Sequence, residues 1–281
     1  MAQMALAMNS ANTARARALW VPREHGAWGM LLVPLVTGAG AAANGGYAAL
    51  GWFVLAAIAL FWVRTPVESL VGASVIRART AEERRAALVA TSIVGGIAIV
   101  ALVVLFWGGQ HLGLVVIGAA AGLAFVAQAI LKKCNRKYRA AAQVIGSIGL
   151  TSTAASAYYL RTGNLGLAAL LLWAVNWLFA AEQIEFVQLR IQGAQLETLR
   201  ERMARGRTHI VTVEMVLAIV VIASASRLLP ALAILAFAPS VARAGVWFFS
   251  IRKPLDVHRL GWMELTNAIL FAALLIGSYR A

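Results

Sequence analysis

The chain has 281 residues, of which 61% are hydrophobic and only 13% are charged. A soluble domain usually carries about 25% charged residues, so this composition excludes a globule covered by water. The formal net charge of +14 does not indicate a nucleic-acid partner, because the basic residues form short clusters between apolar runs. In a membrane protein, such clusters meet anionic lipid headgroups, so membrane lipids are the expected partners.

Residues 1–20 are rich in alanine and methionine, and Arg15 and Arg17 follow the apolar stretch instead of preceding it. That order is not typical of a secretory signal. We predict a mobile cytoplasmic tail over residues 1–20 and a single transmembrane helical domain over residues 21–281.

Nine apolar runs follow the tail, and most have about the 20 residues that an α-helix needs to cross the hydrocarbon core. Backbone polar groups must be satisfied inside lipid, so helices are expected. The predicted fold class is therefore all-α, a polytopic membrane bundle of about nine transmembrane helices. The predicted spans are Ala27–Ala43, Tyr47–Val63, Ala86–Trp107, Leu112–Leu131, Ala140–Leu160, Leu165–Ala181, Ile210–Ser226, Pro230–Phe249 and Leu260–Tyr279.

The basic residues provide an independent test of these spans. Of the 25 lysine and arginine residues, Arg161, Arg227 and Arg280 fall in outer segments, Arg243 lies within the eighth run, and all others fall in inner segments. Cytoplasmic loops carry such an excess of positive charge. We therefore predict an inside N-terminus and a multi-pass membrane protein.

Two inner connections are long, from Arg64 to Arg85 and from Glu182 to His209, and both mix acidic and basic residues at helical spacing. We predict in each an amphipathic helix that lies at the interface. Function often gathers on such connections above a rigid scaffold. All eleven acidic residues lie at inner positions on this topology, so we expect a site that opens to the cytoplasm.

Small residues recur along the fifth run at spacings of three and four. Such spacing lets neighbouring backbones approach closely, so this run is expected to pack tightly against other helices. The residues are Ala142, Gly146, Gly149, Thr153 and Ala157.

Two polar patches lie at the entry to the first run and at the exit from the second. Arg23, Glu24 and His25 supply a cation, an acceptor and a group that titrates near neutrality; the alternative is an interfacial anchor with an internal ion pair. Arg64 and Glu68 flank Pro66, which favours a helix break that frees backbone groups. The alternative is that Arg64 extends to lipid phosphates.

Two more patches lie on the sixth and ninth runs. Glu182 and Glu185 are spaced i, i+3 near Asn176 and Arg190, so they could hold a divalent cation. Ordinary pairing with loop arginines is the favoured interpretation.

Glu264 and Asn267 in the last run are also spaced i, i+3 and lie about one turn inside the bilayer. Charges at that depth usually face a cavity or a partner, so a site role is expected there.

The run Pro22–Trp28 resembles the opening signature of the YwiC-like family of bacterial membrane proteins. The similarity continues through Arg64-Thr65-Pro66 and Gly261-Trp262-Met263-Glu264. This resemblance implies a multi-pass protein of the bacterial cytoplasmic (inner) membrane without an assigned reaction.

A second resemblance is to the UbiA superfamily of intramembrane prenyltransferases, which have nine helices and an inside N-terminus. Those enzymes bind an isoprenyl diphosphate through Mg²⁺ held by aspartate-rich motifs after helices two and six. This sequence has a single aspartate, Asp256, and places Arg64 and Glu68 at the first motif position and Glu182 and Glu185 at the second. Mg²⁺ prefers carboxylate oxygens. The basic first position argues against standard Mg²⁺-dependent transfer, so no cofactor is assigned.

The leading hypothesis is a UbiA-like protein that binds or modifies an isoprenoid or anionic lipid in a cytoplasm-facing cavity. Any reaction would be a UbiA-like transfer to or from a lipid substrate. The candidate catalytic residues are His25, Glu182 and Glu264. The candidate binding residues are Arg23, Glu24, His25, Arg64, Glu68, Asn176, Glu185, Arg190 and Asn267.

Two alternatives remain open. A transporter or permease for a small solute is supported by Glu264, Asn267 and the predicted break in the second helix. A scaffold whose basic loops recruit a partner is the other.

Overall fold

The computed structural model describes residues 25–43, 45–72, 77–109, 111–134, 139–196, 198–249 and 255–281. These residues are helical, with short turns between the helices and no strand among them, which confirms the predicted all-α class. The predicted tail over residues 1–20 lies outside the described residues. The helices are α2 (His25–Ala41), α3 (Ala48–Val71), α4 (Ala81–Trp107), α5 (Leu112–Cys134), α6 (Arg139–Thr151), α7 (Thr153–Thr162), α8 (Leu167–Gln192), α9 (Leu199–Ala225), the 3₁₀ helix η2 (Ala231–Phe237), α10 (Ala238–Phe249) and α11 (Val257–Arg280).

Within the described ranges, seven helical segments are long and apolar enough to cross a membrane. They are α3, α4, α5, α8, α9, the η2–α10 pair and α11. The other two predicted spans are also helical. One is the 17-residue helix α2, and the other is divided into α6 and α7 beside Ser152. The predicted polytopic membrane bundle is confirmed.

The chain divides into two compact units. The first contains the helical hairpin of α3 and α4, and the second, called the main unit here, contains α2 and the helices from α5 to α11. Each is described by itself. The prediction of a single domain over residues 21–281 stays a prediction.

The predicted break at Pro66 is wrong. Helix α3 continues through Pro66 to Val71 and ends at Gly72, whose φ of 75° suits a glycine. Pro66 has no backbone N–H to donate to the carbonyl of Trp62, four residues earlier in the helix. One missing hydrogen bond is therefore accommodated without ending the helix.

The predicted interfacial helices are also wrong for the residues that the structure describes. Residues 64–71 extend α3, and α4 already begins at Ala81, behind a capping box formed by Thr80 and Glu83. Likewise, α8 continues to Gln192, and α9 begins at Leu199 behind the equivalent box of Thr198 and Glu201. The charged residues of both connections do lie on helices, as their spacing indicated. These helices are the end turns of α3, α4, α8 and α9, not separate interfacial helices.

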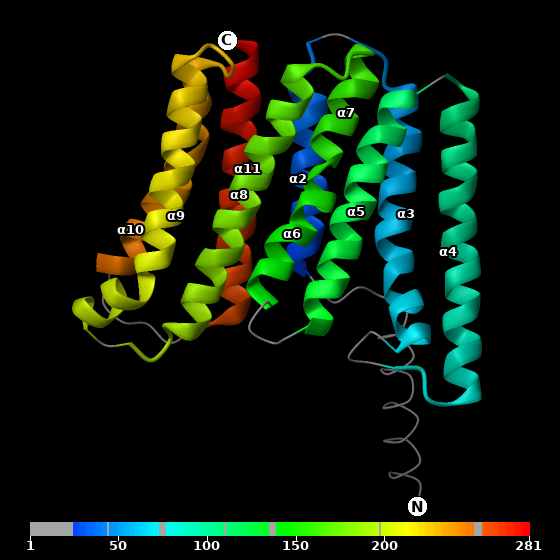
Figure 1. Cartoon of the computed structure of the whole chain (residues 1–281), viewed down its shortest axis with the longest axis horizontal. Helices are drawn as coiled ribbons and strands as arrows, with labels where there is room; N and C mark the ends of the chain where they lie inside the picture. Colours follow the sequence, from blue (N-terminus) through cyan, green and yellow to red (C-terminus); the bar gives the residue numbers. More distant parts are fainter. Residues whose placement is uncertain are drawn as a thin grey trace, which may run out of the picture. The chain divides into compact units, whose positions relative to one another are not determined.

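Figure 1 shows that consecutive spans of the main unit alternate in direction, with α6 and α7 forming one span and η2 and α10 another. Helices α5 and α8 finish, and α6, α9 and α11 begin, at the end of the unit that is lowest in that view. Lys132, Arg190, Arg200 and Arg259 lie within about a turn of these helix ends. This distribution is the one that orients a membrane protein. We call it the basic end of the main unit.

The core of the main unit joins α8, η2 and α11. The rings of Phe179 and Phe271 stack with centroids 3.9 Å apart, and Phe237 meets both edge-on. All three side chains are buried. This aromatic contact fixes α8 and α11 side by side, immediately next to the polar residues described below.

Close packing through small residues is confirmed along the fifth span. A Cβ added at Gly146 would meet the Gln128 side chain at 2.3 Å, and one added at Gly149 would meet the Ala121 carbonyl at 3.2 Å. Both neighbours belong to α5. The absence of side chains at these two positions therefore lets α5 and α6 approach closely.

Candidate functional site

A charged residue lies inside the main unit, in the apolar segment formed by η2 and α10. Arg243 on α10 is 8% exposed. A charge within a membrane-spanning helix is costly, so such a side chain needs partners inside the protein. The partners of its guanidinium group define the site.

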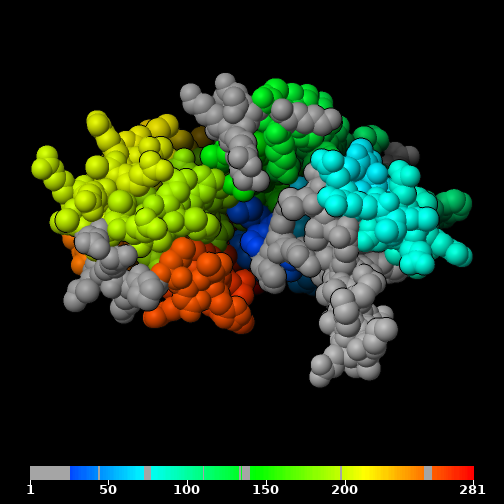
Figure 2. Space-filling view, turned by 90° about the horizontal axis from the view of Figure 1, so that it is seen from below, coloured from blue at the N-terminus to red at the C-terminus, as the bar shows by residue number. Residues whose placement is uncertain are grey.

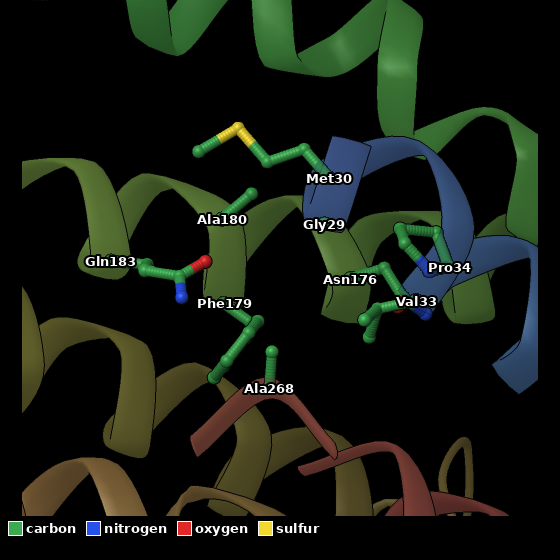
Figure 3. Close-up of a pocket in the computed structure, with 9 residues that line it drawn as sticks. All are labelled: Gly29, Met30, Val33, Pro34, Asn176, Phe179, Ala180, Gln183 and Ala268. Atoms are coloured by element: carbon green, nitrogen blue, oxygen red, sulfur yellow. The ribbon is translucent and has the colours of Figure 1, made fainter. Parts of the chain in front are cut away.

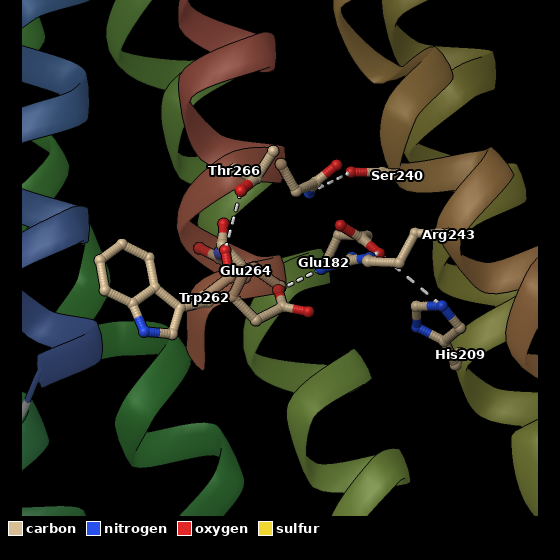
Figure 4. A network of polar contacts seen from close by, with 9 residues as sticks. Glu182, His209, Ser240, Arg243, Trp262, Glu264 and Thr266 are labelled. Carbon is tan, nitrogen blue, oxygen red and sulfur yellow. Dashed lines mark hydrogen bonds and ion pairs between the residues drawn. The ribbon is translucent and has the colours of Figure 1, made fainter. Parts of the chain in front are cut away.

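Two carboxylates from two other helices meet this guanidinium group (Figure 4). Nη2 of Arg243 donates to Oε1 of Glu182 on α8 at 2.6 Å, and Nη1 donates to Oε2 of Glu264 on α11. Glu182 is 1% exposed and Glu264 is 7% exposed. One arginine therefore ties together three helices that are far apart in the sequence.

An imidazole and an aromatic ring complete the surroundings of the arginine. The Phe186 ring centroid lies 4.0 Å from Cζ of Arg243 and 5.4 Å from the ring centroid of His209 on α9. Nε2 of His209 lies 3.7 Å from Oε1 of Glu182, which is too long for a hydrogen bond. We call Glu182, His209, Arg243 and Glu264 the charge cluster.

Two amides support the same helices. Nδ2 of Asn267 donates to Oγ of Ser240 at 3.1 Å, one turn away from the ion pair. Nε2 of Gln183 donates to the backbone carbonyl of Glu264 at 3.1 Å. The position of Glu264 is therefore fixed by its own helix, by α8 and by α10.

Several buried polar atoms at this site have no hydrogen-bond partner within the described ranges. They are Oε2 of Glu182, Oε1 of Glu264, Oδ1 of Asn267, both ring nitrogens of His209 and Nε of Arg243. Most buried polar side-chain atoms have at least one partner. The site thus keeps unused capacity to accept a proton or a hydrogen bond.

A narrow crevice lies beside the charge cluster, between α2, α8 and α11 (Figure 3). Gly29, Met30, Val33 and Pro34 line it from α2, and Ala268 lines it from α11. From α8 it is lined by Asn176, Phe179, Ala180 and Gln183. Because Gln183 also holds the Glu264 backbone, the crevice ends one hydrogen bond from the cluster.

An apolar groove of about 310 Å³ adjoins the crevice and runs between α2 and α11. Val33 lines both. The exposed side chains at its edges include Leu32, Val36 and Ile269. The groove thus opens on the outer, apolar surface of the main unit. It is lined by Leu32, Val33, Val36, Ile269, Ala272, Ala273 and Ile276.

The start of α2, which leads to the crevice, lies at the basic end of the main unit. Figure 2 views the molecule from that end, and the start of α2 lies set back between α8–α9 and the beginning of α11. The first residues of α2 are therefore recessed relative to the ends of their neighbours.

Three predicted site residues come together in the structure. Glu182 and Glu264 share Arg243, and Asn267 lies one turn from Glu264. The ion pairing favoured for Glu182 is observed, but its partner is an arginine within a membrane helix and not one in a loop. The catalytic role predicted for the two glutamates stays a prediction.

Two more predicted residues lie near them on α8. Asn176 lines the crevice, where its Oδ1 accepts from the Thr37 hydroxyl at 3.0 Å and its Nδ2 donates to the Leu172 carbonyl. It therefore pins α2 to α8. Arg190 is half-buried two turns beyond Gln183, and its charge acts on Glu264.

The remaining predicted residues are not brought into the charge cluster. Arg64 and Glu68 belong to the hairpin of α3 and α4, where Nε of Arg64 donates to Oε1 of Glu68 at 2.7 Å. Glu185 lies one turn after Glu182 and is only partly buried. Arg23, Glu24 and the side chain of His25 lie outside the described residues.

Three residues of the site were missed by the sequence prediction, namely Ser240, Arg243 and His209. The signal for Arg243 was present, because a lone arginine inside an apolar run requires a buried carboxylate. His209 and Ser240 carried no comparable signal, since their contacts depend on how α9, α10 and α11 pack.

The described part of the chain contains no group of three His, Cys, Asp or Glu side chains placed to hold a metal ion. The two carboxylates of the charge cluster are instead engaged with Arg243. A divalent cation on the Glu182–Glu185 pair therefore has no support in the arrangement of these residues.

The fold and the charge cluster define a multi-pass α-helical membrane protein. Residues 21–158 match the family model described as YwiC-like protein, so this part of the chain is YwiC-like and the resemblance of the opening run is confirmed. The matched stretch begins four residues before α2, extends into α7 and ends before the charge cluster. No curated protein and no solved structure matches the chain.

Proposed function

We propose that the protein binds an amphiphilic lipid, with an isoprenoid as the leading candidate, in the bacterial cytoplasmic membrane. The lipid chain occupies the groove between α2 and α11, and the polar end reaches the crevice. One observation carries this proposal. The groove and the crevice share Val33, and they lead from an apolar outer surface to the polar residues Asn176 and Gln183.

The dimensions and lining of the groove support a hydrocarbon occupant. Its volume of about 310 Å³ lies at the lower end of the range for small-molecule sites, roughly 300–1,000 Å³. Its lining is apolar, and its edge residues are exposed at the surface that faces lipid. A lipid chain can therefore enter sideways from the bilayer without crossing a polar barrier.

The crevice supports only a small polar end, because its volume of about 10 Å³ holds roughly one water-sized group. Pro34 has no backbone N–H, so the carbonyl of Met30 lacks its usual donor within α2. Figure 3 shows the amide of Gln183 beside the same space. A hydroxyl or a similar donor would satisfy these acceptors. An anionic head group that extended toward the basic end would meet Arg190, the one predicted head-group arginine on these helices.

Photochemical labelling in proteoliposomes tests the proposal. The probes are farnesol and farnesyl diphosphate, each carrying a photoreactive group on its chain, with and without Mg²⁺ and with excess unlabelled probe as competitor. We expect competed labelling on α2 and α11. Ala273→Trp should abolish it by filling the groove, because Ala273 lines the groove and is exposed.

The matched control is Ala218→Trp, which places the same bulk at an exposed position of α9. This variant should keep full labelling. Labelling that is distributed over all exposed helices, or that is insensitive to Ala273→Trp, would exclude the groove as a lipid site. Comparison of the two probes then assigns the polar end as a hydroxyl or a diphosphate.

A solute permease is the second candidate, supported by the charge cluster inside the membrane segments and by the division of the fifth span at Ser152. Transporters often place buried charges and interrupted helices at their binding sites. Currents after concentration jumps of small solutes, measured on proteoliposomes adsorbed to an electrode, distinguish the two. Solute-driven currents that are unaffected by Ala273→Trp would favour the permease.

A further inference from the structure

The charge cluster contains an unequal number of acidic and basic groups. Glu182 and Glu264 carry two negative charges when both are ionised, Arg243 carries one positive charge, and a neutral His209 carries none. All four residues are less than 10% exposed. The cluster would therefore hold an unbalanced negative charge in a region from which water is largely excluded, which is a costly arrangement.

We propose that the charge cluster is a binding site for one exchangeable proton, held on a carboxyl group of the Glu182–Glu264 pair. One proton leaves a single ion pair with Arg243 and a neutral carboxylic acid. This inference goes beyond lipid binding and does not depend on what occupies the groove.

Unused acceptor atoms support the site independently of the charge count. Oε2 of Glu182 and Oε1 of Glu264 have no hydrogen-bond partner among the residues that the structure describes, so each offers a place for the proton. The other oxygen of each carboxylate is already bonded to Arg243. The two glutamates are therefore alternative carriers of the same proton.

His209 is the other group that could take the proton. Its Nε2 lies 3.7 Å from Oε1 of Glu182, and both of its ring nitrogens lack hydrogen-bond partners in the described ranges. Protonation there would place a second cation near Arg243 and leave two ionised carboxylates buried. A proton on a carboxyl group leaves fewer charges in the dry interior, so the carboxyl is the favoured carrier.

The charged groups around the site come from four helices. Glu182 and Arg190 belong to α8, His209 to α9, Arg243 to α10 and Glu264 to α11. Arg190 acts on Glu264 but is only half-buried, near the basic end, where water and salt screen it. Arg190 therefore does not replace the proton.

Infrared spectroscopy of the full-length protein in lipid measures this proton directly. The wild type should show a carboxylic-acid C=O band that shifts in D₂O and disappears at alkaline pH. Because either glutamate alone is balanced by Arg243, Glu182→Gln and Glu264→Gln should each remove the band. Arg243→Gln should instead about double its intensity, since both carboxyls then need protons.

Matched variants separate this site from other carboxyl groups. Glu82→Gln, at an exposed position in the first turn of α4, should leave the band unchanged. The proposal is overturned if the wild type lacks the band or if the band survives both single glutamine substitutions. A band that appears only in Arg190→Gln would show that Arg190 balances the cluster, which also overturns it. If one of the two glutamine variants does not fold, loss or survival of the band in the other decides the test.

Discussion

Arg243 is the residue on which the packing of the last helices depends. Its guanidinium group is bonded to Glu182 and Glu264, and its Cζ lies 4.0 Å from the centroid of the Phe186 ring. Removal of one partner from a buried ion pair leaves an uncompensated charge, which costs far more than the net contribution of the pair. The same reasoning explains why one arginine can hold three helices in register.

We predict that Arg243→Leu lowers the free energy of unfolding by about 3–5 kcal/mol, because two carboxylates lose their shared partner. Unfolding in a detergent mixture, followed by circular dichroism, measures this change. The control is Arg64→Leu in the partly buried pair with Glu68, which should cost clearly less, because Arg64 balances one carboxylate one turn away on its own helix. Equal losses in the two variants would contradict the role assigned to Arg243.

At the scale of elements, the close packing of α2 against α7 depends on a glycine. A Cβ built at Gly38 would lie 2.0 Å from the Ala154 carbonyl oxygen, so α2 and α7 touch backbone to backbone. Nearby, the Thr153 hydroxyl donates to the Leu31 carbonyl at 2.9 Å across the same two helices. A side chain at Gly38 would have to push the helices apart.

Gly38→Ala should therefore destabilise the protein by about 1–3 kcal/mol, the range of overpacking in a tight core. Gly29→Ala on the same helix is the matched control, since a Cβ there meets nothing within 4 Å. Alanine loses less conformational freedom than glycine when the chain folds, so that variant should be neutral or slightly stabilising. Thermal unfolding in detergent compares the two, and a stable Gly38→Ala protein would contradict the close contact.

These elements show what a sequence can and cannot predict for such a protein. The apolar runs and the basic loops predicted the helices and their direction, because the requirements of the bilayer apply to each segment separately. Pro66 misled the prediction, because a single missing hydrogen bond does not decide where a helix ends. Continuation of α3 to Val71 and of α8 to Gln192 depends on packing and caps, which composition does not reveal.

The site was predicted in part for the same reason. Glu182, Glu264 and Asn267 were selected because their cost inside a membrane implies a partner. Arg243 could be recognised in the sequence as a charge inside an apolar run. Its contacts with α8 and α11 depend on how the helices pack, which the sequence pattern does not show. In the sequence, Arg64 resembled Arg243 as an arginine beside an apolar run. Its carboxylate partner, Glu68, lies only one turn away on the same helix.

At the scale of the whole molecule, the topology is decided by which side of the membrane the basic end of the main unit faces. The basic end of the main unit carries the ends of α5 and α8 and the beginnings of α9 and α11. The recessed start of α2 is seen from the same end. If this end faces the cytoplasm, the basic segments lie on the inner side, where the topology requires them to be.

Cysteine labelling in intact cells tests this assignment most directly. Cys134 is exposed at the end of α5 and is the native reporter for the basic end. In a Cys134→Ser background, Gln195→Cys reports on the turn between α8 and α9, and Asn164→Cys on the turn before α8; both positions are exposed. A maleimide that cannot cross the membrane should label Asn164→Cys at once, and Cys134 and Gln195→Cys only after permeabilisation. Labelling of Gln195→Cys in intact cells would contradict the account.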